Sequence, residues 1–467
     1  MRRRVLHSGL RLWVDPQAAF VALHGRDENC FWLDCGIDAS EGVSAMGAAA
    51  SVMVDKSGAR VLDVLREGLR DHEDVVVEGA GFRLGWVGWL GYELRSHTMC
   101  EAHGRSSKHP NAAMMWVDRA VVFDHSAGTV SLLALGTEWS GELLVWRDAT
   151  AAALLTVATS DAPQPTPSQT SVTGQASVTW AHREEQYLEM IAECQRAIRN
   201  GDAYQLCLTT AAHVDSPPDP LQAYLALRRS SPAHHGGFLR VADVSVLSSS
   251  PEQFLAVDPD GAILTRPIKG TRPRAADQEN DLALARELRE SEKEQAENLM
   301  IVDLMRNDFT RVCDVGSVEV TSLLAVETYP HVHQLVSTVR GRLRPGLNAI
   351  DAIEACFPAG SMTGAPKREA TRILDRLEGR ARGIYSGAFG HLGLDGRLDL
   401  GMVIRTIVID GEGATVGAGG GITVLSDPAE ELAEVRLKAA ALLRVLVGEP
   451  DRRDDAGSGS AEHRVSA

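Results

Sequence analysis

Between Lys293 and Asp308 the sequence reads KEQAENLMIVDLMRND, and we expect all of it except Asp308 to belong to one helix over residues 280–307. Residues three, four and seven apart share a face of a helix. One face therefore combines two carboxylates with an apolar stripe, made by Glu294, Glu297, Ile301, Leu304 and Met305. Carboxylates on a core-facing stripe are costly unless they are paired, protonated or bound to a metal. The stripe predicts a functional acidic cluster, and the alternative is the solvated start of an ordinary charged helix.

A second helix, expected over residues 428–447, repeats this arrangement. Asp427 would cap it, and Pro428 would occupy its first position. One of its faces carries Glu431, Glu434 and Lys438. Two helices that each offer Glu-x-x-Glu predict a hard cation with oxygen ligands, and Mg²⁺ suits such a site.

Two glycine-containing segments could hold an anion beside these helices. Residues 417–421 read GAGGG, which lets backbone N–H groups approach a ligand closely. Residues 357–367 read FPAGSMTGAPK and lead into a helix whose free N–H groups could hold a carboxylate. Plain turns and an ordinary capped loop remain the alternative interpretations.

Lys269 lies in the run RPIKGT at residues 266–271, between a β-branched residue and a glycine. A lysine acts as a nucleophile only when it is neutral, and burial beside apolar atoms lowers its pKa toward that state. Most lysines are solvated charges, so the reactive interpretation depends on the neighbouring motifs. Together the motifs predict an anionic substrate, a divalent cation, acid–base carboxylates and an amine nucleophile.

Composition excludes several classes of partner. A formal net charge of −16 argues against a nucleic-acid partner. No apolar run approaches the length of a membrane span, and the basic residues 2–4 do not begin a signal peptide. The seven cysteines are scattered and never spaced as Cys-x-x-Cys, which disfavours a disulfide framework or a zinc site. These features fit a cytoplasmic protein.

The 467 residues are enough for more than one hydrophobic centre. Residues 156–180 are rich in Ser, Thr, Pro and Gln and predict a flexible linker, whereas residues 450–467 predict a disordered tail. The linker would separate an amino-terminal region, residues 1–155, from a catalytic domain, residues 181–449.

The two regions differ in their expected elements. The first consists mostly of strands, expected at 31–34, 84–92 and 130–135. The second also carries helices, expected at 183–200, 280–307, 367–377 and 428–447. A meander of paired strands is expected at 398–404, 406–410 and 414–418.

These motifs strongly resemble the chorismate-binding enzyme family, which includes anthranilate synthase component I, aminodeoxychorismate synthase component I, isochorismate synthases and salicylate synthases. The most specific matches are Ser250-Pro251-Glu252, residues 293–308 and residues 358–367. The resemblance spans residues 185–446 and extends more loosely into the amino-terminal region. It implies an α+β fold, a layered α/β/β/α sandwich with two β-sheets inside and helices outside.

The resemblance also implies a role for each candidate residue. The expected catalytic residues are Lys269, Glu252 and Glu294. The expected Mg²⁺ ligands are Glu297, Glu434 and Glu431. Chorismate would be held by Thr271, Gly360, Tyr385, Arg405, Gly419, Gly420, Gly421 and Lys438. Glu294 would protonate the departing 4-hydroxyl group, Lys269 would add to carbon 2, and ammonia would then attack carbon 4 and expel the lysine, with Glu252 as the proton acceptor.

Within the family, Lys269 indicates the reaction, because the aminodeoxychorismate branch has lysine where anthranilate synthases usually have alanine. Gln205 stands where isochorismate-type enzymes usually place a lysine that activates water, which disfavours water addition. The expected reaction converts chorismate and ammonia into 4-amino-4-deoxychorismate, for p-aminobenzoate and folate or for a specialised metabolite. No segment resembles a glutamine amidotransferase, so a separate glutamine amidotransferase subunit is expected to supply the ammonia.

The chain departs from the family pattern at two places. Gln334 occupies the position at which many relatives have a histidine, and a glutamine cannot act as an acid near neutral pH. Either Glu294 suffices, or the preceding His333 reaches the site. Residues 36–50 lack the Arg-Phe-Ser-type segment of relatives, so a tryptophan site is not predicted. The alternative functions are anthranilate synthase component I and a catalytically silent regulatory relative.

Overall fold

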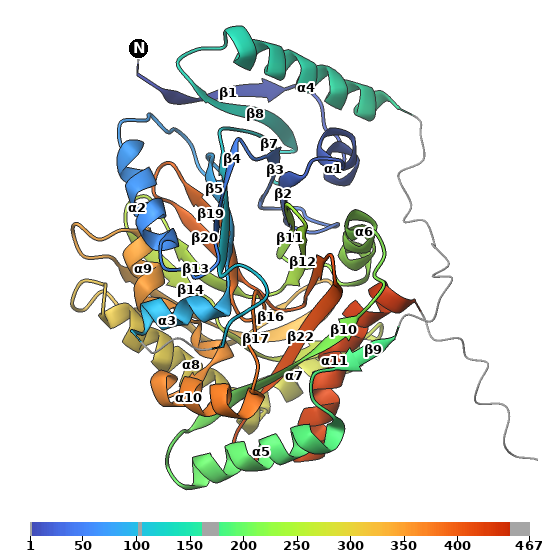
Figure 1. The fold of residues 1–467 in the computed structure, drawn as a ribbon, viewed down its shortest axis with the longest axis vertical. Helices are drawn as coiled ribbons and strands as arrows, with labels where there is room; N and C mark the ends of the chain where they lie inside the picture. The colour runs from blue at the N-terminus through green and yellow to red at the C-terminus, as the bar shows by residue number, and fades with distance from the viewer. Residues whose placement is uncertain (1, 101–104, 161–176, 449–467) are drawn as a thin grey trace, which may run out of the picture.

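The computed structural model of the protein describes residues 2–100, 105–160 and 177–448. Two large antiparallel β-sheets lie at its centre, and helices cover their outer faces (Figure 1). This architecture confirms the expected α+β fold with its α/β/β/α layers.

The first sheet draws its strands from both ends of the chain. Its order is β1 (Arg4–Leu10), β8 (Thr129–Gly136), β7 (Arg119–Asp124), β3 (Val43–Ala48), β2 (Asn29–Asp34), β11 (His235–Val241), β12 (Val244–Ser250), β21 (Thr406–Asp410), β22 (Gly413–Ile422), β10 (Gln205–Val214) and β18 (Gly364–Ala365), with β9 (Val178–Trp180) also paired to β10.

The second sheet is built in the same way. Its order is β15 (Ile268–Pro273), β17 (Val332–Arg342), β14 (Ala262–Thr265), β13 (Gln253–Val257), β20 (Leu398–Met402), β19 (Ala388–Gly393), β5 (Gly85–Leu90), β6 (Ala112–Val117) and β4 (Ser51–Asp55), with β16 (Glu319–Thr328) also paired to β17.

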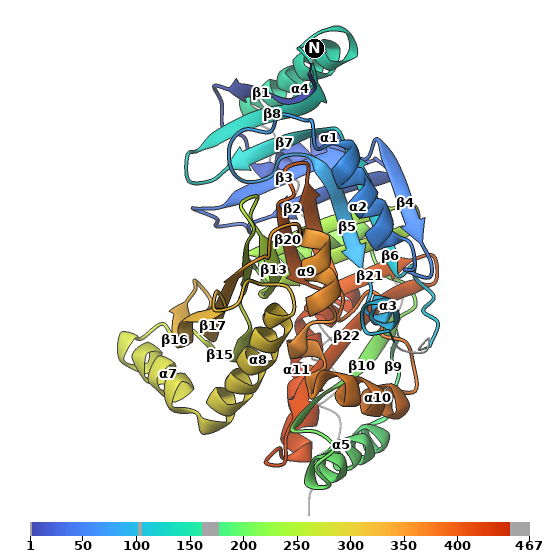
Figure 2. The ribbon, with the colours of Figure 1, turned by 90° about the vertical axis from the view of Figure 1, so that its left-hand side faces the viewer.

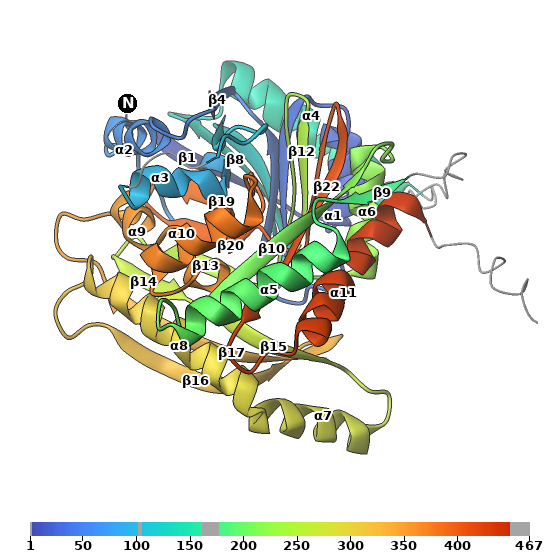
Figure 3. The same cartoon turned by 60° about the horizontal axis from the view of Figure 1, so that its bottom comes forward.

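The longer helices fall into two groups. Those packed on the first sheet are α1 (Pro16–His24), α4 (Gly141–Thr159), α5 (Glu184–Arg199), α6 (Pro220–Ser230), α10 (Lys367–Glu378) and α11 (Pro428–Val447). Those on the side of the second sheet are α2 (Val61–Asp71), α7 (Gln278–Glu290), α8 (Glu292–Thr310) and α9 (Ala349–Cys356), with the short α3 (Arg95–Thr98) nearby. Figure 3 shows α5 lying along β10 and beside α11.

Three hydrophobic cores explain the layers. One core joins the first sheet to its helices and contains Phe20, Trp32 and Tyr187. A second fills the space between the sheets, through side chains such as Phe31 and Trp89. A third joins the other face of the second sheet to α2, α8 and α9. Because side chains alternate along a strand, neighbouring residues such as Phe31 and Trp32 serve different cores.

Three helices begin at the same local signal. An Asp-Pro pair precedes or opens α1, α6 and α11, and the aspartates are Asp15, Asp219 and Asp427. In each case the carboxylate accepts a hydrogen bond from a backbone N–H of the first turn, while proline occupies a position that needs no N–H donor. The expected helix over residues 428–447 is confirmed as α11, with its predicted cap.

The predicted amino-terminal and catalytic regions share both sheets. Strand β2 pairs with β11 in the first sheet, and β5 pairs with β19 in the second. The predicted linker, residues 156–180, begins within α4 and ends with β9. Its residues 161–176, and the predicted tail at 450–467, lie outside the described residues.

The helix expected over residues 280–307 is wrong as a single element. It is divided into α7 and α8 by Ser291, whose hydroxyl accepts a hydrogen bond from the backbone N–H of Glu294 and so starts a new helix. The acidic stripe lies entirely on α8, where Glu297, Ile301 and Met305 are buried as predicted.

The expected meander is also wrong in part, because its strands belong to different sheets. Strand β20 pairs with β13 and β19 in the second sheet, whereas β21 and β22 pair in the first. The chain crosses between the sheets at residues 403–405. Arg405 completes the crossing in a left-handed conformation, with φ +50°.

Two further findings bear on the environment of the chain. None of the helices in the described part of the chain combines the length and the apolar character needed to cross a bilayer. All seven cysteines are free thiols, so no disulfide contributes to the fold.

Candidate active site

A cavity of about 580 Å³ is lined by residues of α8, β15 and β17 and by residues of α11, β10 and β22. Figure 2 shows where these two groups of elements lie in the fold. Every residue predicted for the site lines this cavity, except Gly360. The residues brought together are Lys269, Glu252, Glu294, Thr271, Tyr385, Arg405, Gly419, Gly420, Gly421, Lys438, Glu297, Glu431 and Glu434. Residues up to 186 positions apart in the sequence thus meet in one place, as Glu252 and Lys438 show.

Lys269 reaches the cavity because the strand that carries it bulges. The register of β15 against β17 shifts between Ile268 and Thr271. Within this bulge Gly270 has φ +80°, a conformation that glycine adopts without strain. A Cβ atom at Gly270 would lie 3.0 Å from Cδ of Glu294. The glycine therefore permits both the bulge and the close approach of the α8 carboxylate.

The charge of Lys269 differs from the expectation for a neutral nucleophile. Burial alone would lower the pKa of Lys269, but Glu297, Cys207 and Glu252 outweigh burial and raise that pKa. The Lys269 Nζ atom lies 3.5 Å from Oε2 of Glu297, and only 14% of the side chain is exposed. In this arrangement Lys269 is an ammonium ion, so it must lose a proton before it can attack a substrate.

Glu252 is suited to exchange that proton. It lies between β12 and β13, is 7% exposed and lines the cavity. Burial raises the pKa of Glu252 to about 7, although Ser361 and Lys269 oppose the shift. A carboxyl group with this pKa can both accept and return a proton near neutral pH.

The first turn of α8 carries Glu294, and contacts farther along anchor the helix. The Asn298 amide donates to the carbonyl oxygen of Leu335, and the Ser337 hydroxyl donates to Asn298 at 2.6 Å. Both partners lie on β17, so α8 is fixed to the sheet beside Lys269. Glu294 itself lies 3.6 Å from Nη1 of Arg272.

Two of the three predicted metal ligands, Glu297 and Glu431, lie close to glycines of β22. Oε2 of Glu297 lies 3.0 Å from the position of a Cβ atom at Gly421, and Oε2 of Glu431 lies 3.1 Å from the equivalent position at Gly420. A side chain at either glycine would crowd the neighbouring carboxylate, and at Gly421 it would also collide with the Gln205 amide at 2.3 Å. The GAGGG run is therefore more than a turn, because its glycines leave room for carboxylates from two helices.

Each of these carboxylates has a lysine partner. Lys438 lies 2.6 Å from Glu434 and Lys293 lies 2.9 Å from Glu431, while Lys269 is the partner of Glu297. Burial raises the pKa of Glu297, although Lys269 opposes the shift. Burial acts in the same direction on Glu434, but Lys438 and the other lysines lower its pKa overall.

The donor set fits Mg²⁺ in its chemistry, since it consists of carboxylate oxygens from two helices. The ammonium of Lys293 already occupies a cation position against Glu431, which is 2% exposed. Within the described residues, however, no three acidic, histidine or cysteine side chains converge closely enough to form a metal cluster as they stand. Metal binding therefore requires a local rearrangement of these side chains.

Arg405 and Tyr385 also line the cavity. The Tyr385 ring packs on Gly417, where a Cβ atom would lie 2.1 Å from the ring. The Arg405 guanidinium donates no hydrogen bond to any of the described residues, and its left-handed backbone follows from the crossing between the sheets. A guanidinium held in this way can bind a carboxylate of a ligand.

Three sequence-based interpretations need revision or completion. Gly360 lies against α8 rather than in the cavity, because a Cβ atom there would meet Leu304 at 2.3 Å. Gln334 lines the cavity, but His333 faces away and bonds Asp281 at 3.0 Å. Adjacent residues on a strand point to opposite faces, so His333 cannot replace the missing histidine.

Gln205 is buried beside Glu297 and does not itself line the cavity. Its Nε2 atom lies 3.5 Å from Oε2 of Glu297, and its Oε1 atom is buried without a partner among the described residues. An amide at this place can donate and accept hydrogen bonds, but it cannot remove a proton from water as a neutral lysine can.

Sequence reasoning missed several residues that shape the walls. Cys207 and Met362 line the cavity, and their carbonyl oxygens accept hydrogen bonds from Arg382 at 2.9 and 2.6 Å. Arg382 is buried and also binds Glu378, four residues earlier. An Arg and Glu four apart are common on solvated helices, so the spacing gave no signal of this role.

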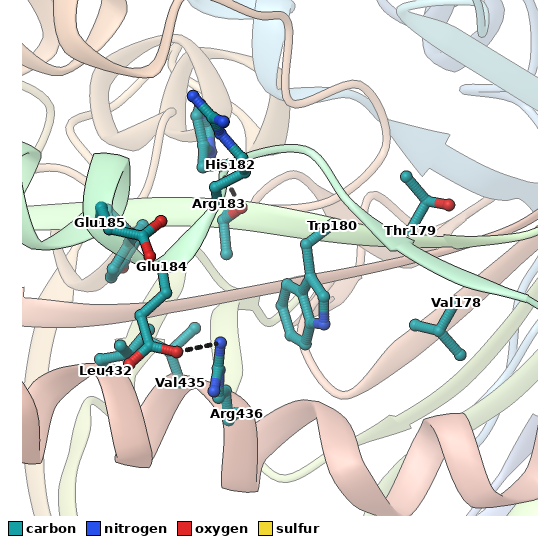
Figure 4. A pocket seen from close by; sticks show the side chains of 12 residues that line it. Val178, Thr179, Trp180, His182, Arg183, Glu184, Glu185, Leu432, Val435 and Arg436 are labelled. Carbon is teal, nitrogen blue, oxygen red and sulfur yellow. Dashed lines mark hydrogen bonds and ion pairs between the residues drawn. The ribbon is translucent and has the colours of Figure 1, made fainter.

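A second cavity, of about 410 Å³, lies between β9, the start of α5 and α11 (Figure 4). Its best-placed polar groups are already paired. Arg436 lies 3.0 Å from Glu184, and the His182 ring bonds Thr210 and a backbone carbonyl group. In the described part of the chain its lining contains no predicted site residue. The first cavity is therefore the candidate active site.

Comparisons with known proteins show which family the chain belongs to. The chain is 41% identical to the aminodeoxychorismate synthase of Streptomyces griseus, over 98% of this chain and 68% of the relative. It is 44% identical to the aminodeoxychorismate synthase of Streptomyces pristinaespiralis, over 83% of this chain and 53% of the relative. The chain thus spans about two thirds and about half of the lengths of these two relatives.

The fold is similar to a crystal structure of anthranilate synthase component I from Streptococcus pneumoniae TIGR4. The TM-score is 0.73 and the identity is 26%, over 94% of this chain and all of that chain. The family model described as chorismate binding enzyme matches residues 28–444, which include every residue that lines the cavity and every strand of the two sheets except β1. The chain therefore belongs to the chorismate-binding enzyme family.

Proposed function

We propose that the chain is aminodeoxychorismate synthase component I, which converts chorismate and ammonia into 4-amino-4-deoxychorismate. The observation that carries the proposal is the bulge at Gly270, which directs Lys269 into the same cavity as Glu252 and Glu294. The names of the two Streptomyces relatives described above support it. Gln205 also supports amination, because the site has no lysine at the position expected to activate water.

The charge of the cavity suits chorismate only if a cation accompanies it. Five cationic side chains line the cavity, namely Lys269, Arg272, Lys293, Arg405 and Lys438. They are matched by five carboxyl groups, those of Glu252, Glu294, Glu297, Glu431 and Glu434. Chorismate carries two carboxylates, so a nearly neutral cavity would need added positive charge to bind it. This balance supports a divalent cation as part of the complete site.

Glu297, Glu431 and Glu434 would hold Mg²⁺ in the proposed enzyme. When bound, Mg²⁺ would supply positive charge for the ring carboxylate of chorismate. Arg405, with its unpaired guanidinium, would take a carboxylate group as well, and the glycine strand would let the substrate approach the backbone.

In the proposed mechanism the carboxylate form of Glu252 first removes a proton from the Lys269 ammonium; a pKa of about 7 makes that form available near neutral pH. The neutral Lys269 Nζ adds to carbon 2 of chorismate, both double bonds of the ring diene shift toward carbon 4, and the bond between carbon 4 and its hydroxyl breaks. Glu294 protonates that hydroxyl, so water departs rather than hydroxide. Ammonia then attacks carbon 4, both double bonds shift back, and the bond from carbon 2 to Lys269 breaks to release the free amine.

We further propose that a separate glutamine amidotransferase subunit supplies the ammonia. The product would serve p-aminobenzoate and folate synthesis or a specialised metabolite. A cytoplasmic location is part of the same proposal, and the seven free thiols are compatible with it.

The product formed from chorismate, ammonium chloride and Mg²⁺ tests the proposal. Liquid chromatography with mass detection should find a non-aromatic amine that retains the enolpyruvyl group. A second tube with aminodeoxychorismate lyase should convert this amine into p-aminobenzoate. Formation of anthranilate and pyruvate would identify an anthranilate synthase instead, and an unchanged chorismate pool would favour a catalytically silent relative.

Glu434→Gln should raise the Mg²⁺ concentration that gives half-maximal activity by roughly tenfold or more, because it removes one charged oxygen ligand. The measurement is a Mg²⁺ titration of the initial rate at saturating chorismate and ammonium. Glu430→Gln is the matched control, since Glu430 is an exposed carboxylate on the same helix. A normal Mg²⁺ titration for Glu434→Gln would remove this residue from the ligand set.

A further inference from the structure

The three lysines that pair with the proposed metal ligands are not equivalent. Lys438 also donates to the carbonyl oxygen of Gly419 at 3.0 Å, so a second contact holds it in the wall. Lys269 is fixed by the bulge in β15 and is the proposed nucleophile. The ammonium of Lys293 has only Glu431 as a hydrogen-bond partner among the described residues.

Lys293 also lies among the three proposed metal ligands. It belongs to the first turn of α8 and reaches Glu431 on α11, so its ammonium bridges the two acidic helices. The same ammonium attracts the carboxylates of Glu297 and Glu434 electrostatically. One cation thus interacts with all three proposed Mg²⁺ ligands.

The surroundings of Glu431 show what its carboxylate retains without Lys293. Its Oε1 atom accepts hydrogen bonds from both Lys293, at 2.9 Å, and the Ser426 hydroxyl, at 2.6 Å. Ser426 lies just before α11 and is buried, so Glu431 would keep one donor after Lys293 leaves. The Lys293 side chain is 39% exposed, and its flexible four-carbon stem allows the ammonium to move into water.

We propose that Lys293 is an internal competitor of the divalent cation: it holds Glu431 in the metal-free protein and must leave when Mg²⁺ binds. This inference rests on the proposed Mg²⁺ site. A monovalent ammonium and a hydrated divalent ion cannot occupy the same carboxylates. Only protein in which Lys293 has moved away can bind Mg²⁺, so the apparent affinity equals the intrinsic affinity multiplied by the fraction of protein in that state. The competition also keeps the acidic cluster neutralised between turnovers.

Calorimetric titration of the full chain with MgCl₂, without chorismate, tests the competition directly. Lys293→Met keeps the length of the side chain but removes its charge, and it should bind Mg²⁺ about tenfold more tightly than the wild-type protein. Lys293→Gln should show the same direction of change, which covers the case in which the methionine variant fails to fold. Lys293→Arg retains a competing cation and should bind Mg²⁺ no more tightly than the wild type.

Lys108→Met is the matched control for the loss of one positive charge. Lys108 pairs with Asp410 and Glu412 at 2.7 and 3.2 Å and does not line the cavity, so this variant should bind Mg²⁺ like the wild type. Unchanged or weaker binding in the folded Lys293→Met and Lys293→Gln variants would overturn the inference, because Lys293 would then help to form the site. Failure of every protein to bind Mg²⁺ would overturn it as well.

These outcomes are separate from the test of the enzyme activity. The titration contains no chorismate and no ammonium, so it reports on the cation alone. An enzyme that forms the amine while Lys293→Met and Lys293→Gln leave Mg²⁺ binding unchanged would refute the competition and keep the proposed function. Tighter Mg²⁺ binding in both variants, together with anthranilate as the product, would support the competition and refute the proposed function.

Discussion

Lys269→Ala is expected to lower the rate of 4-amino-4-deoxychorismate formation by about a thousandfold at saturating chorismate and ammonium, which corresponds to about 4 kcal/mol in the activation barrier. The reason is geometric. The bulge in β15 directs a single buried amine into the cavity, and alanine offers no nucleophile at that place. The measurement is the initial rate with ammonium chloride as the nitrogen source, followed by product chromatography.

Two controls separate covalent catalysis from charge. Lys269→Arg keeps a cation near Glu297 but provides no amine with an accessible neutral form, so it should be nearly as inactive as Lys269→Ala. Lys108→Ala, outside the cavity, should retain wild-type activity. An unimpaired rate for Lys269→Ala would show that ammonia attacks chorismate directly.

Intact-protein mass spectrometry of the wild type with chorismate but no ammonium should detect the covalent adduct between Lys269 and the chorismate ring.

Some features of the site could be predicted from the sequence because they repeat at helical spacing. Glu294 and Glu297 share a face of α8, and Glu431 and Glu434 share a face of α11, as the three-residue spacing requires. The short-range signals were also reliable at Asp427 and Pro428, which start α11 as predicted. These features depend on neighbours within one helical turn, and the sequence displays such neighbours directly.

Other features depend on contacts between distant segments. The division at Ser291 was missed because a serine is compatible with a helix interior as well as with a cap. The role of Arg405 as the crossing point between two sheets requires knowledge of which strands pair. The same limit applies to Gly360, which packs against Leu304 on α8 rather than lining the cavity.

The charge of Lys269 illustrates the limit most clearly. The sequence predicts burial, and burial alone would give a neutral amine. The structure places Glu297, Cys207 and Glu252 around the same ammonium, and their combined effect raises its pKa instead. The need for a proton acceptor therefore follows from the packing of several strands and helices, and it gives Glu252 its importance.

Glu252→Gln should reduce the rate of amination by a factor of roughly a hundred to ten thousand, the usual loss when a general base is removed. In the wild type the carboxylate form of Glu252 is needed, and burial raises its pKa to about 7. The rate at saturating substrates should therefore rise with pH through about 7, and the residual rate of Glu252→Gln should lack this rise. A pH profile with the same rise in the variant would assign the titration to another group.

The same substitution should stabilise the protein at alkaline pH. The pKa of Glu252 is raised from 4.5 in the unfolded chain to about 7 in the folded one, so the folded state prefers the protonated form. The contribution of Glu252 to the free energy of unfolding is fully present below pH 4.5. It is lost as the pH rises through about 7, by at most about 3 kcal/mol. Glutamine carries no such penalty, so Glu252→Gln should unfold in urea with a larger free energy than the wild type at pH 8.

Opposite changes in activity and stability would distinguish a functional carboxyl group from a structural one. A carboxylate that held the fold together would lower the stability when it was replaced, because its hydrogen-bond partners would lose a charged acceptor. Ser361 is the partner of Glu252 at this place, and glutamine can still accept a hydrogen bond from its hydroxyl. Reduced stability of Glu252→Gln at pH 8 would therefore contradict the raised pKa and, with it, the assignment of Glu252 as the proton acceptor for Lys269.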